Sequence, residues 1–174
     1  IFVAGFMLCM GLNGYGQYYY KDIFSNNQLL AEMVMLKEQK IRTVKVTGLD
    51  DDGRPSDGFT VEKQINRNYT EVETFTRSAE SGPSLFNSRF TKDGLLVQTV
   101  DSSDLAVNTS NYTYDDNNRI KSIRSHIHSS DDDFTNEITE THNYEYDERG
   151  LLQRMYRITN GRDTTLILLS PDEP

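Results

Sequence analysis

Two closely similar stretches, 112–120 and 144–152, constrain the fold of this chain more than any other feature of its sequence. They match at every key position with an offset of 32 residues: Tyr-x-Tyr-Asp, then Asn or Gly, then Ile or Leu. Two weaker copies share part of the pattern: 90–96 keeps the aromatic residue, the glycine and the leucine, and 49–55 keeps the aspartate and the glycine. The pattern positions that form the candidate binding face are Phe90, Tyr112, Tyr114, Asp115, Asn118, Ile120, Tyr144, Tyr146, Asp147, Gly150 and Leu152.

The repeated unit predicts a β-hairpin. Tyr-x-Tyr places both rings on one face of a strand, because side chains alternate along it. The aspartate can accept hydrogen bonds from the backbone of the turn, and Gly or Asn tolerates the positive φ that such a turn requires. The Ile or Leu two residues later comes from the returning strand, so we expect aromatic and aliphatic side chains to gather on one face of a sheet.

These residues resemble the tyrosine-aspartate (YD) repeat of the Rhs family, most clearly at 144–152 and 112–120 and over roughly 85–158 in all. In large members of that family, long arrays of such hairpins form a β-sheet shell around a toxin cargo or an extracellular adhesive scaffold. This chain has about four units at spacings of 41, 24 and 32 residues, which is too few for a closed shell. The chain also resembles small exported proteins of Bacteroidetes-like bacteria.

The rest of the chain predicts an α+β fold that is mainly β. One amphipathic helix is expected at about 25–39, within an N-terminal segment 17–40, because apolar residues recur there at helical spacing. It should pack on a curved antiparallel meander of eight or more strands in a domain spanning 41–170. The expected inward side chains are Val44, Val46, Phe59, Val61, Val72, Phe90, Leu96, Tyr112, Tyr114, Ile120, Tyr144, Tyr146, Leu152, Tyr156 and alternate residues of 166–168.

The apolar start of the chain predicts a signal peptide over residues 1–16. Its apolar run, 1–12, is shorter than the ~20 residues of a membrane-spanning helix, and Gly14 and Gly16 suit a cleavage site before Gln17. Two alternatives remain open, a buried first strand or helix and a lipoprotein anchor on Cys9. The signal peptide predicts export to the periplasm or to the outer surface of a Gram-negative bacterium.

The composition excludes several classes of function. A formal charge of −9 disfavours a nucleic-acid or anionic-membrane surface as a partner. The single cysteine, Cys9, excludes a disulfide framework, a zinc–cysteine cluster and, in the mature chain, a thiol nucleophile. No serine lies in a nucleophile elbow, and no phosphate loop or basic patch is present. We therefore expect neither a cofactor nor an enzyme, with a hydrolase of dispersed residues as the remaining enzymatic reading.

Two groups of residues suggest metal binding, and neither has the right spacing. His126, His128 and His142 lie on two neighbouring predicted strands, but a turn centred on Asp131 would place His126 and His142 about 20 Å apart. The acidic runs 50–52 and 131–133 do not fit a calcium loop, so solvated turns are the better interpretation. Glu140 is the one glutamate of its strand on the aromatic side, and it forms no evident catalytic pair.

Two functions remain for such a chain. The first is an exported, non-catalytic binding or scaffold module that presents the aromatic face of the sheet, or its open edge, to an envelope protein or a glycan. The alternative is a periplasmic lipid or lipoprotein carrier, with the helix as a lid over a half-open barrel. The feature that separates them is whether the face under Leu29, Leu30, Met33 and Val34 is a packed core or a cavity.

Overall fold

The structure, a computed structural model, describes residues 15–79, 82–129 and 137–169. Most of the predicted leader and the acidic run 131–133 lie outside these residues. The elements in chain order are α1 (Tyr15–Glu38), β1 (Thr43–Leu49), β2 (Pro55–Ile65), β3 (Glu71–Ser78), β4 (Gly82–Phe90), β5 (Leu96–Ser103), β6 (Ala106–Tyr114), β7 (Ile120–Ser129), β8 (Ile138–Tyr146), β9 (Leu152–Thr159) and β10 (Asp163–Leu168).

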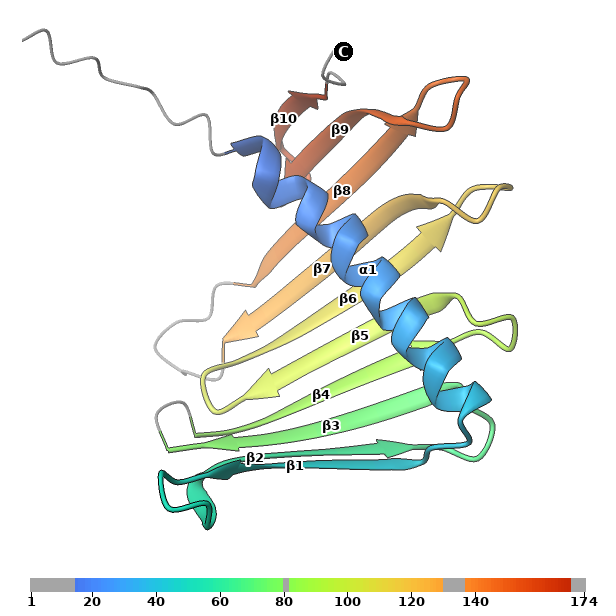
Figure 1. Cartoon of the computed structure of the whole chain (residues 1–174). Helices are drawn as coiled ribbons and strands as arrows, with labels where there is room; N and C mark the ends of the chain where they lie inside the picture. The colour runs from blue at the N-terminus through green and yellow to red at the C-terminus, as the bar shows by residue number, and fades with distance from the viewer. Residues whose placement is uncertain (1–14, 80–81, 130–136, 170–174) are drawn as a thin grey trace, which may run out of the picture.

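The ten strands form one open antiparallel sheet in which each strand pairs with its neighbours in sequence, from β1 at one edge to β10 at the other. Helix α1 runs diagonally across one face of this sheet (Figure 1). We call that side the covered face and the other the uncovered face. The prediction of a mainly-β α+β fold, with a meander of eight or more strands and one helix, is confirmed. The sheet does not close on itself.

Helix α1 begins at Tyr15, ten residues before the start expected at Ser25. Ser25 therefore lies inside the helix and does not cap it. No residue between Tyr15 and Ser25 is a strong helix breaker. Asp22 and Ile23 contact the sheet, and these tertiary contacts stabilise the additional helical turns. The helix ends at Glu38 in a Schellman motif. Lys40, just beyond the end, has φ 56°, and the Ile41 N–H bonds the Leu36 carbonyl oxygen at 2.9 Å.

The core lies between α1 and the covered face, in two clusters that share the partly buried Tyr112. The buried members of the first cluster are Met33, Leu36, Ile65, Val72, Phe90 and Leu96. The buried members of the second are Ile120, Ile123, Tyr144 and Met155. The second cluster contains residues of the two stronger copies, 112–120 and 144–152, and the first contains residues of the weaker copy at 90–96.

Five side chains expected in the core lie elsewhere. Val46 and Phe59 lie on the covered face but are 47% and 42% exposed. They belong to neither core cluster, because the clusters form under the helix and these two residues lie away from it. Tyr156, Leu166 and Leu168 belong to the uncovered face. Their strands are in the register that pairs Ile167 with the buried Met155, so the alternate residues point away from α1.

Candidate functional site

The two stronger copies of the repeat form turns with the same hydrogen bonds. Oδ1 of Asp115 accepts from the N–H groups of Asn117 and Arg119, both at 2.9 Å. Oδ1 of Asp147 accepts in the same way from Arg149 at 2.9 Å and Leu151 at 2.8 Å. These backbone hydrogen bonds are the largest influence holding the pKa of each aspartate below its usual value. The aspartate of the repeat is therefore a turn-forming residue.

The strand pairing beside these turns is also repeated. Each hairpin has a register shift just before its turn, after which the pattern aromatic pairs with a residue six positions later: Phe90 with Leu96, Tyr114 with Ile120 and Tyr146 with Leu152. The left-handed position falls on Gly94 at φ 90°, Asn118 at φ 59° and Gly150 at φ 80°. The three hairpins are structurally equivalent units.

In the two stronger copies, the second tyrosine joins the unit to the one before it. The Tyr114 hydroxyl donates to the carbonyl oxygen of Leu96 at 2.8 Å, and the Tyr146 hydroxyl donates to that of Ile120 at 2.9 Å. Leu96 and Ile120 occupy the same position in successive units. Burial is the main cause that raises the pKa of Tyr114, and it raises the pKa of Tyr146 to about 12.

The copy at 49–55 has the same turn but lies at the other end of the sheet. The Asp50 N–H bonds the Arg54 carbonyl oxygen at 2.9 Å, and Gly53 has φ 77°. This turn connects β1 to β2, whereas the three units above connect an even-numbered strand to an odd-numbered one, so their turns share the opposite end of the meander (Figure 1). The sequence pattern alone does not distinguish the two ends.

The hairpin in phase with the three units is β2–β3, which the sequence pattern missed. Asn66 takes the place of the aspartate, and its Oδ1 accepts from the Thr70 N–H at 2.9 Å. Tyr69 takes the left-handed position with φ 55°, and Ile65 pairs with Val72 next to the turn. The available signal was an Asn at the aspartate position, since Asn and Asp accept turn hydrogen bonds equally.

The residues predicted as a binding face are part of the core or of these turns. Tyr144 is 5% exposed, Phe90 6% and Ile120 4%, while Tyr112, Tyr114, Tyr146 and Leu152 are partly buried against the same clusters. Asp115, Asn118, Asp147 and Gly150 form the turns described above. Helix α1 contacts part of this set through Asn26, which donates to the Tyr114 hydroxyl, and Asp22, which accepts from the Tyr144 hydroxyl. Tyr114, Tyr144 and Tyr146 also line a hollow of about 460 Å³ next to the turns.

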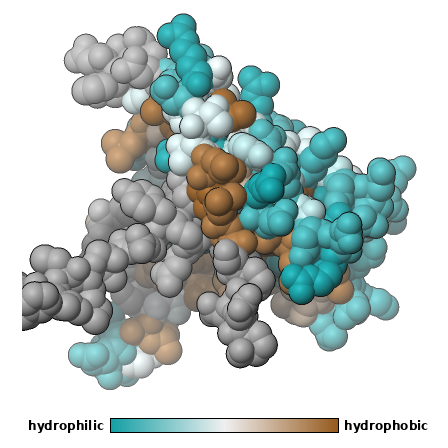
Figure 2. Space-filling view, turned by 90° about the horizontal axis from the view of Figure 1, so that it is seen from above, coloured by the Kyte–Doolittle hydropathy of each residue, from teal (hydrophilic) through white to brown (hydrophobic). Residues whose placement is uncertain are grey.

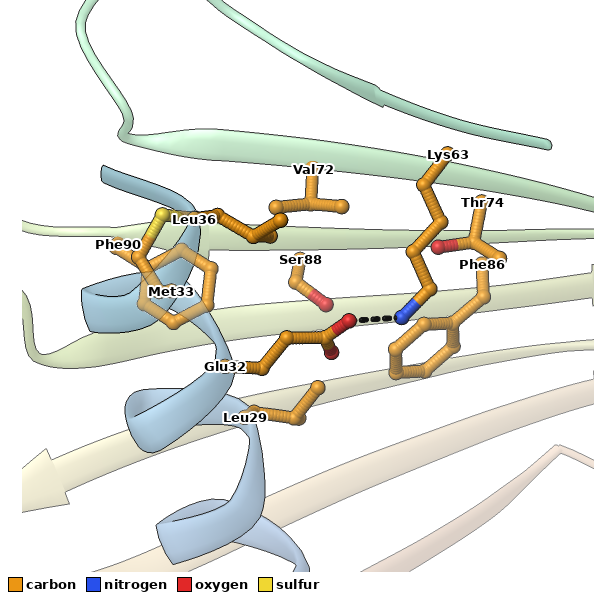
Figure 3. Close-up of a pocket in the computed structure, with 10 residues that line it drawn as sticks. All are labelled: Leu29, Glu32, Met33, Leu36, Lys63, Val72, Thr74, Phe86, Ser88 and Phe90. Carbon is orange, nitrogen blue, oxygen red and sulfur yellow. Dashed lines mark hydrogen bonds and ion pairs between the residues drawn. The ribbon is translucent and has the colours of Figure 1, made fainter. Parts of the chain in front are cut away.

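The apolar face of α1 is packed against the sheet. The space enclosed under it is about 120 Å³, lined by side chains that include Leu29, Met33 and Leu36 (Figure 3). An ion pair between Glu32 and Lys63 lies beside this space. Val34 is 53% exposed and points away from the core. Ligand pockets for small molecules usually have volumes of about 300–1,000 Å³, so this space is smaller than a typical ligand pocket.

A charged cluster connects the first half of α1 to β8 and β9. Nδ1 of His142 lies 2.6 Å from Oδ2 of Asp22, and its Nε2 lies 2.7 Å from Oε1 of Glu140. The Arg157 Nε donates to the other Glu140 oxygen at 2.6 Å, and the Tyr144 hydroxyl donates to Asp22 at 3.0 Å. Burial, followed by the Asp22 charge, raises the pKa of Tyr144.

Two basic side chains, His142 and Arg157, meet two acidic ones, Asp22 and Glu140, in this cluster. The His142 side chain is only 9% exposed, so the cluster is largely shielded from solvent at its centre.

This cluster forms one wall of a groove of about 420 Å³, which we call the helix groove. Three serines, Asn108, the Tyr112 ring and three isoleucines complete its walls. The lining residues are Asp22, Ser25, Asn108, Ser110, Tyr112, Ile123, Ser125, Ile127, Ile138, Glu140, His142 and Arg157. The helix groove therefore combines hydroxyl groups and apolar side chains with two acidic and two basic groups.

The three histidines lie on opposite faces of the sheet. His126 pairs with Thr139 and is on the uncovered face, whereas His142 pairs with Ile123 on the covered face. These partners differ from the expected ones, Asn136 for His126 and Ile120 for His142. The observed register centres the pairing of β7 and β8 further along the chain than Asp131. Among residues 15–79, 82–129 and 137–169, no three His, Cys, Asp or Glu side chains are placed to hold a metal ion. Asp50, Asp51 and Asp52 are exposed in the first turn.

No protein-family model matches the chain, and no curated protein matches its sequence. In the part of the chain that the structure describes, no helix has the length and apolarity needed to traverse a bilayer.

Proposed function

We propose that the protein is an exported, non-catalytic binding module that holds a neutral glycan in the helix groove. Its hairpins act as YD-type repeats that build the scaffold, and its location is the periplasm or the outer surface of a Gram-negative bacterium. Export rests on the leader-like composition of residues 1–16. The glycan proposal rests on the lining of the helix groove.

The repeat proposal is supported by the shared geometry of the hairpins. The aspartate that accepts turn hydrogen bonds, the left-handed Asn or Gly, and the tyrosine hydroxyl that reaches the previous unit recur at the same positions of successive units. Such contacts hold the sheet at a fixed curvature under α1. The array then serves to position the helix groove.

Three properties of the helix groove favour a neutral, polyhydroxylated ligand. Its volume of about 420 Å³ is within the usual range for small-molecule pockets. The Ser25 hydroxyl can both donate to and accept from a sugar, and the hydroxyls of Ser110 and Ser125, which bond each other at 2.8 Å, keep unused acceptor sites. The wall has two acidic and two basic side chains, so neither type dominates, and the Tyr112 ring offers an apolar surface beside them.

The same contacts support a role in binding rather than catalysis. A general base needs a nitrogen or oxygen that can take a proton from the substrate. Both ring nitrogens of His142 face carboxylates, and Glu140 is bonded to both His142 and Arg157. The lipid-carrier alternative has less support, because the apolar space under α1 is small and the larger groove is polar.

Binding to a printed array of neutral and acidic oligosaccharides tests this proposal. We expect the protein to retain neutral oligosaccharides, and Ser25→Trp, which fills the helix groove, to weaken the affinity at least about tenfold. Gln28→Trp adds the same side chain at an exposed position of α1 and should leave the affinity unchanged. Equal binding by Ser25→Trp, binding of acidic oligosaccharides alone, or no binding would each contradict the glycan assignment.

A further inference from the structure

Among the residues that the structure describes, β10 is the edge strand of the open sheet, so one row of its backbone groups has no strand beside it. The Leu169 N–H bonds the Gln153 carbonyl oxygen at 3.0 Å, so the odd-numbered residues of this stretch direct their backbone groups toward β9. By the alternation of an antiparallel ladder, Thr164, Leu166 and Leu168 direct their N–H and C=O groups outward. These three residues form a template for a further strand.

The side chains at this edge are apolar or neutral. No charged residue occurs from Thr164 to Leu168, and Leu166 and Leu168 are 51% and 66% exposed on the uncovered face. Tyr156 of β9 lies next to Leu166 on that face. Figure 2 views the molecule from the side on which β10 lies in Figure 1, and hydrophobic side chains form a patch in the middle of this view.

The opposite edge, β1, carries a charge that hinders strand addition. The Ile65 N–H bonds the Arg42 carbonyl oxygen, so Thr43, Lys45 and Thr47 direct their backbone groups outward. Lys45 lies in the middle of this row, and lysine on an edge strand is a common protection against unwanted pairing. Strand β10 lacks this protection.

We propose that β10 pairs with β10 of a second copy of this chain, antiparallel and across a two-fold axis at Leu166. In this register Leu166 lies opposite the partner's Leu166, and Thr164 lies opposite the partner's Leu168. All three pairs use the outward backbone groups, and the leucines bury one another on the uncovered face. The two sheets become one continuous sheet, and both helix grooves stay open. This inference is independent of the glycan proposal.

A second copy fits this edge better than an unrelated peptide for two reasons. The strand is self-complementary in this register, because its uncharged residues meet uncharged residues and its central leucine meets itself. A two-fold pairing also closes the interface, whereas β10 pairing with β1 would continue head to tail and place Lys45 in the new ladder. Each copy has a charge of −9, so added salt should strengthen the association by screening this repulsion.

Sedimentation velocity of the full chain over a wide concentration range tests the proposal. We expect a reversible monomer–dimer equilibrium that shifts toward dimer with salt. Leu166→Lys and Leu166→Glu should each be monomeric, because like charges then face each other across the axis. An equimolar mixture of the two should form a dimer, because each Lys then faces a Glu. This recovery occurs only if Leu166 lies close to Leu166 of the second copy.

The matched control is Leu49→Lys, which changes an exposed leucine (66%, against 51% for Leu166) at the other edge and should dimerise like the unmodified protein. If Leu166→Lys fails to fold, Thr164→Pro removes an outward N–H and provides the same test. A monomer at every concentration, larger head-to-tail species, or a Lys and Glu mixture that stays monomeric would overturn the proposal.

Discussion

Oδ2 of Asp22 lies 2.6 Å from Nδ1 of His142, and this contact joins α1 to β8 across 120 residues of sequence. The same aspartate oxygen accepts from the Tyr144 hydroxyl, so one carboxylate contacts two residues of β8. Asp22 thereby fixes the first half of α1 over the sheet. It also sets the position of one wall of the helix groove.

Asp22→Ala should destabilise the protein by about 2 kcal/mol, because it leaves the buried His142 with one carboxylate and Tyr144 without its acceptor. Chemical denaturation followed by circular dichroism measures the change in the free energy of unfolding. Asp116→Ala removes an exposed carboxylate and should change that free energy by less than about 0.5 kcal/mol. Equal effects of the two substitutions would show that the cluster contributes nothing.

Tyr146→Phe should cost about 1 kcal/mol, because it removes one hydroxyl bond to the preceding unit and leaves the ring in place. Tyr114→Phe should cost more, about 2 kcal/mol, because the Tyr114 hydroxyl both donates to Leu96 and accepts from Nδ2 of the buried Asn26 at 3.0 Å. Tyr156→Phe, on the uncovered face, is the control and should be nearly neutral, and chemical denaturation measures all three costs. A Tyr146→Phe cost as small as that of the control would show that the bond between units contributes nothing.

Asp147→Asn should change how stability depends on acid. The folded state holds the pKa of Asp147 below its ordinary value of 3.8. The ionised Asp147 therefore contributes its full share of the folding stability above pH 3.8, and this share is lost as the pH falls toward the lowered pKa. We expect the variant to be less stable at neutral pH and to lose less stability between about pH 4 and pH 2. Unfolding midpoints in urea at several pH values measure this. Glu148→Gln, in the same turn, should keep the original pH dependence.

Gly150→Ala should destabilise the protein by about 1–2 kcal/mol, because φ 80° is costly for a residue with a Cβ atom. The added Cβ would also lie 3.2 Å from Nη1 of Arg119, a flexible side chain that can shift. Asn118→Gly makes the reverse change at the equivalent position and should be neutral or slightly stabilising. Thermal unfolding of both variants decides whether the left-handed position limits the turn.

Much of the fold could be predicted because the relevant forces are local. Alternation along a strand, the aspartate of the turn and the residue that accepts positive φ all lie within nine residues of one another in the repeat. The start of α1 could not be predicted, since Tyr15 to Phe24 carry weak helix signals and contacts of Asp22 and Ile23 with the sheet hold that turn in place. The hairpin at Asn66 was missed because its unit lacks the aromatic residue and the aspartate of the pattern and keeps the turn hydrogen bond to the side chain.

The candidate site was harder to predict than the fold. The sequence places Glu140, His142 and Tyr144 on one face of a strand, which the structure confirms. It does not indicate that Asp22 and Arg157 complete the cluster, because they come from α1 and β9. Nor does it indicate that Asn26 and Asp22 of α1 bond the hydroxyl groups of Tyr114 and Tyr144.

The sequence by itself determined the hairpins, their turns and the mainly-β class, because each depends on the dihedral preferences and alternation of neighbouring residues. Only the tertiary structure decided which face of the sheet α1 covers, which residues form the helix groove and which edge strand remains unprotected. Those outcomes depend on burial and on contacts between residues more than a hundred positions apart, as between Asp22 and His142, and a local pattern carries no information about them.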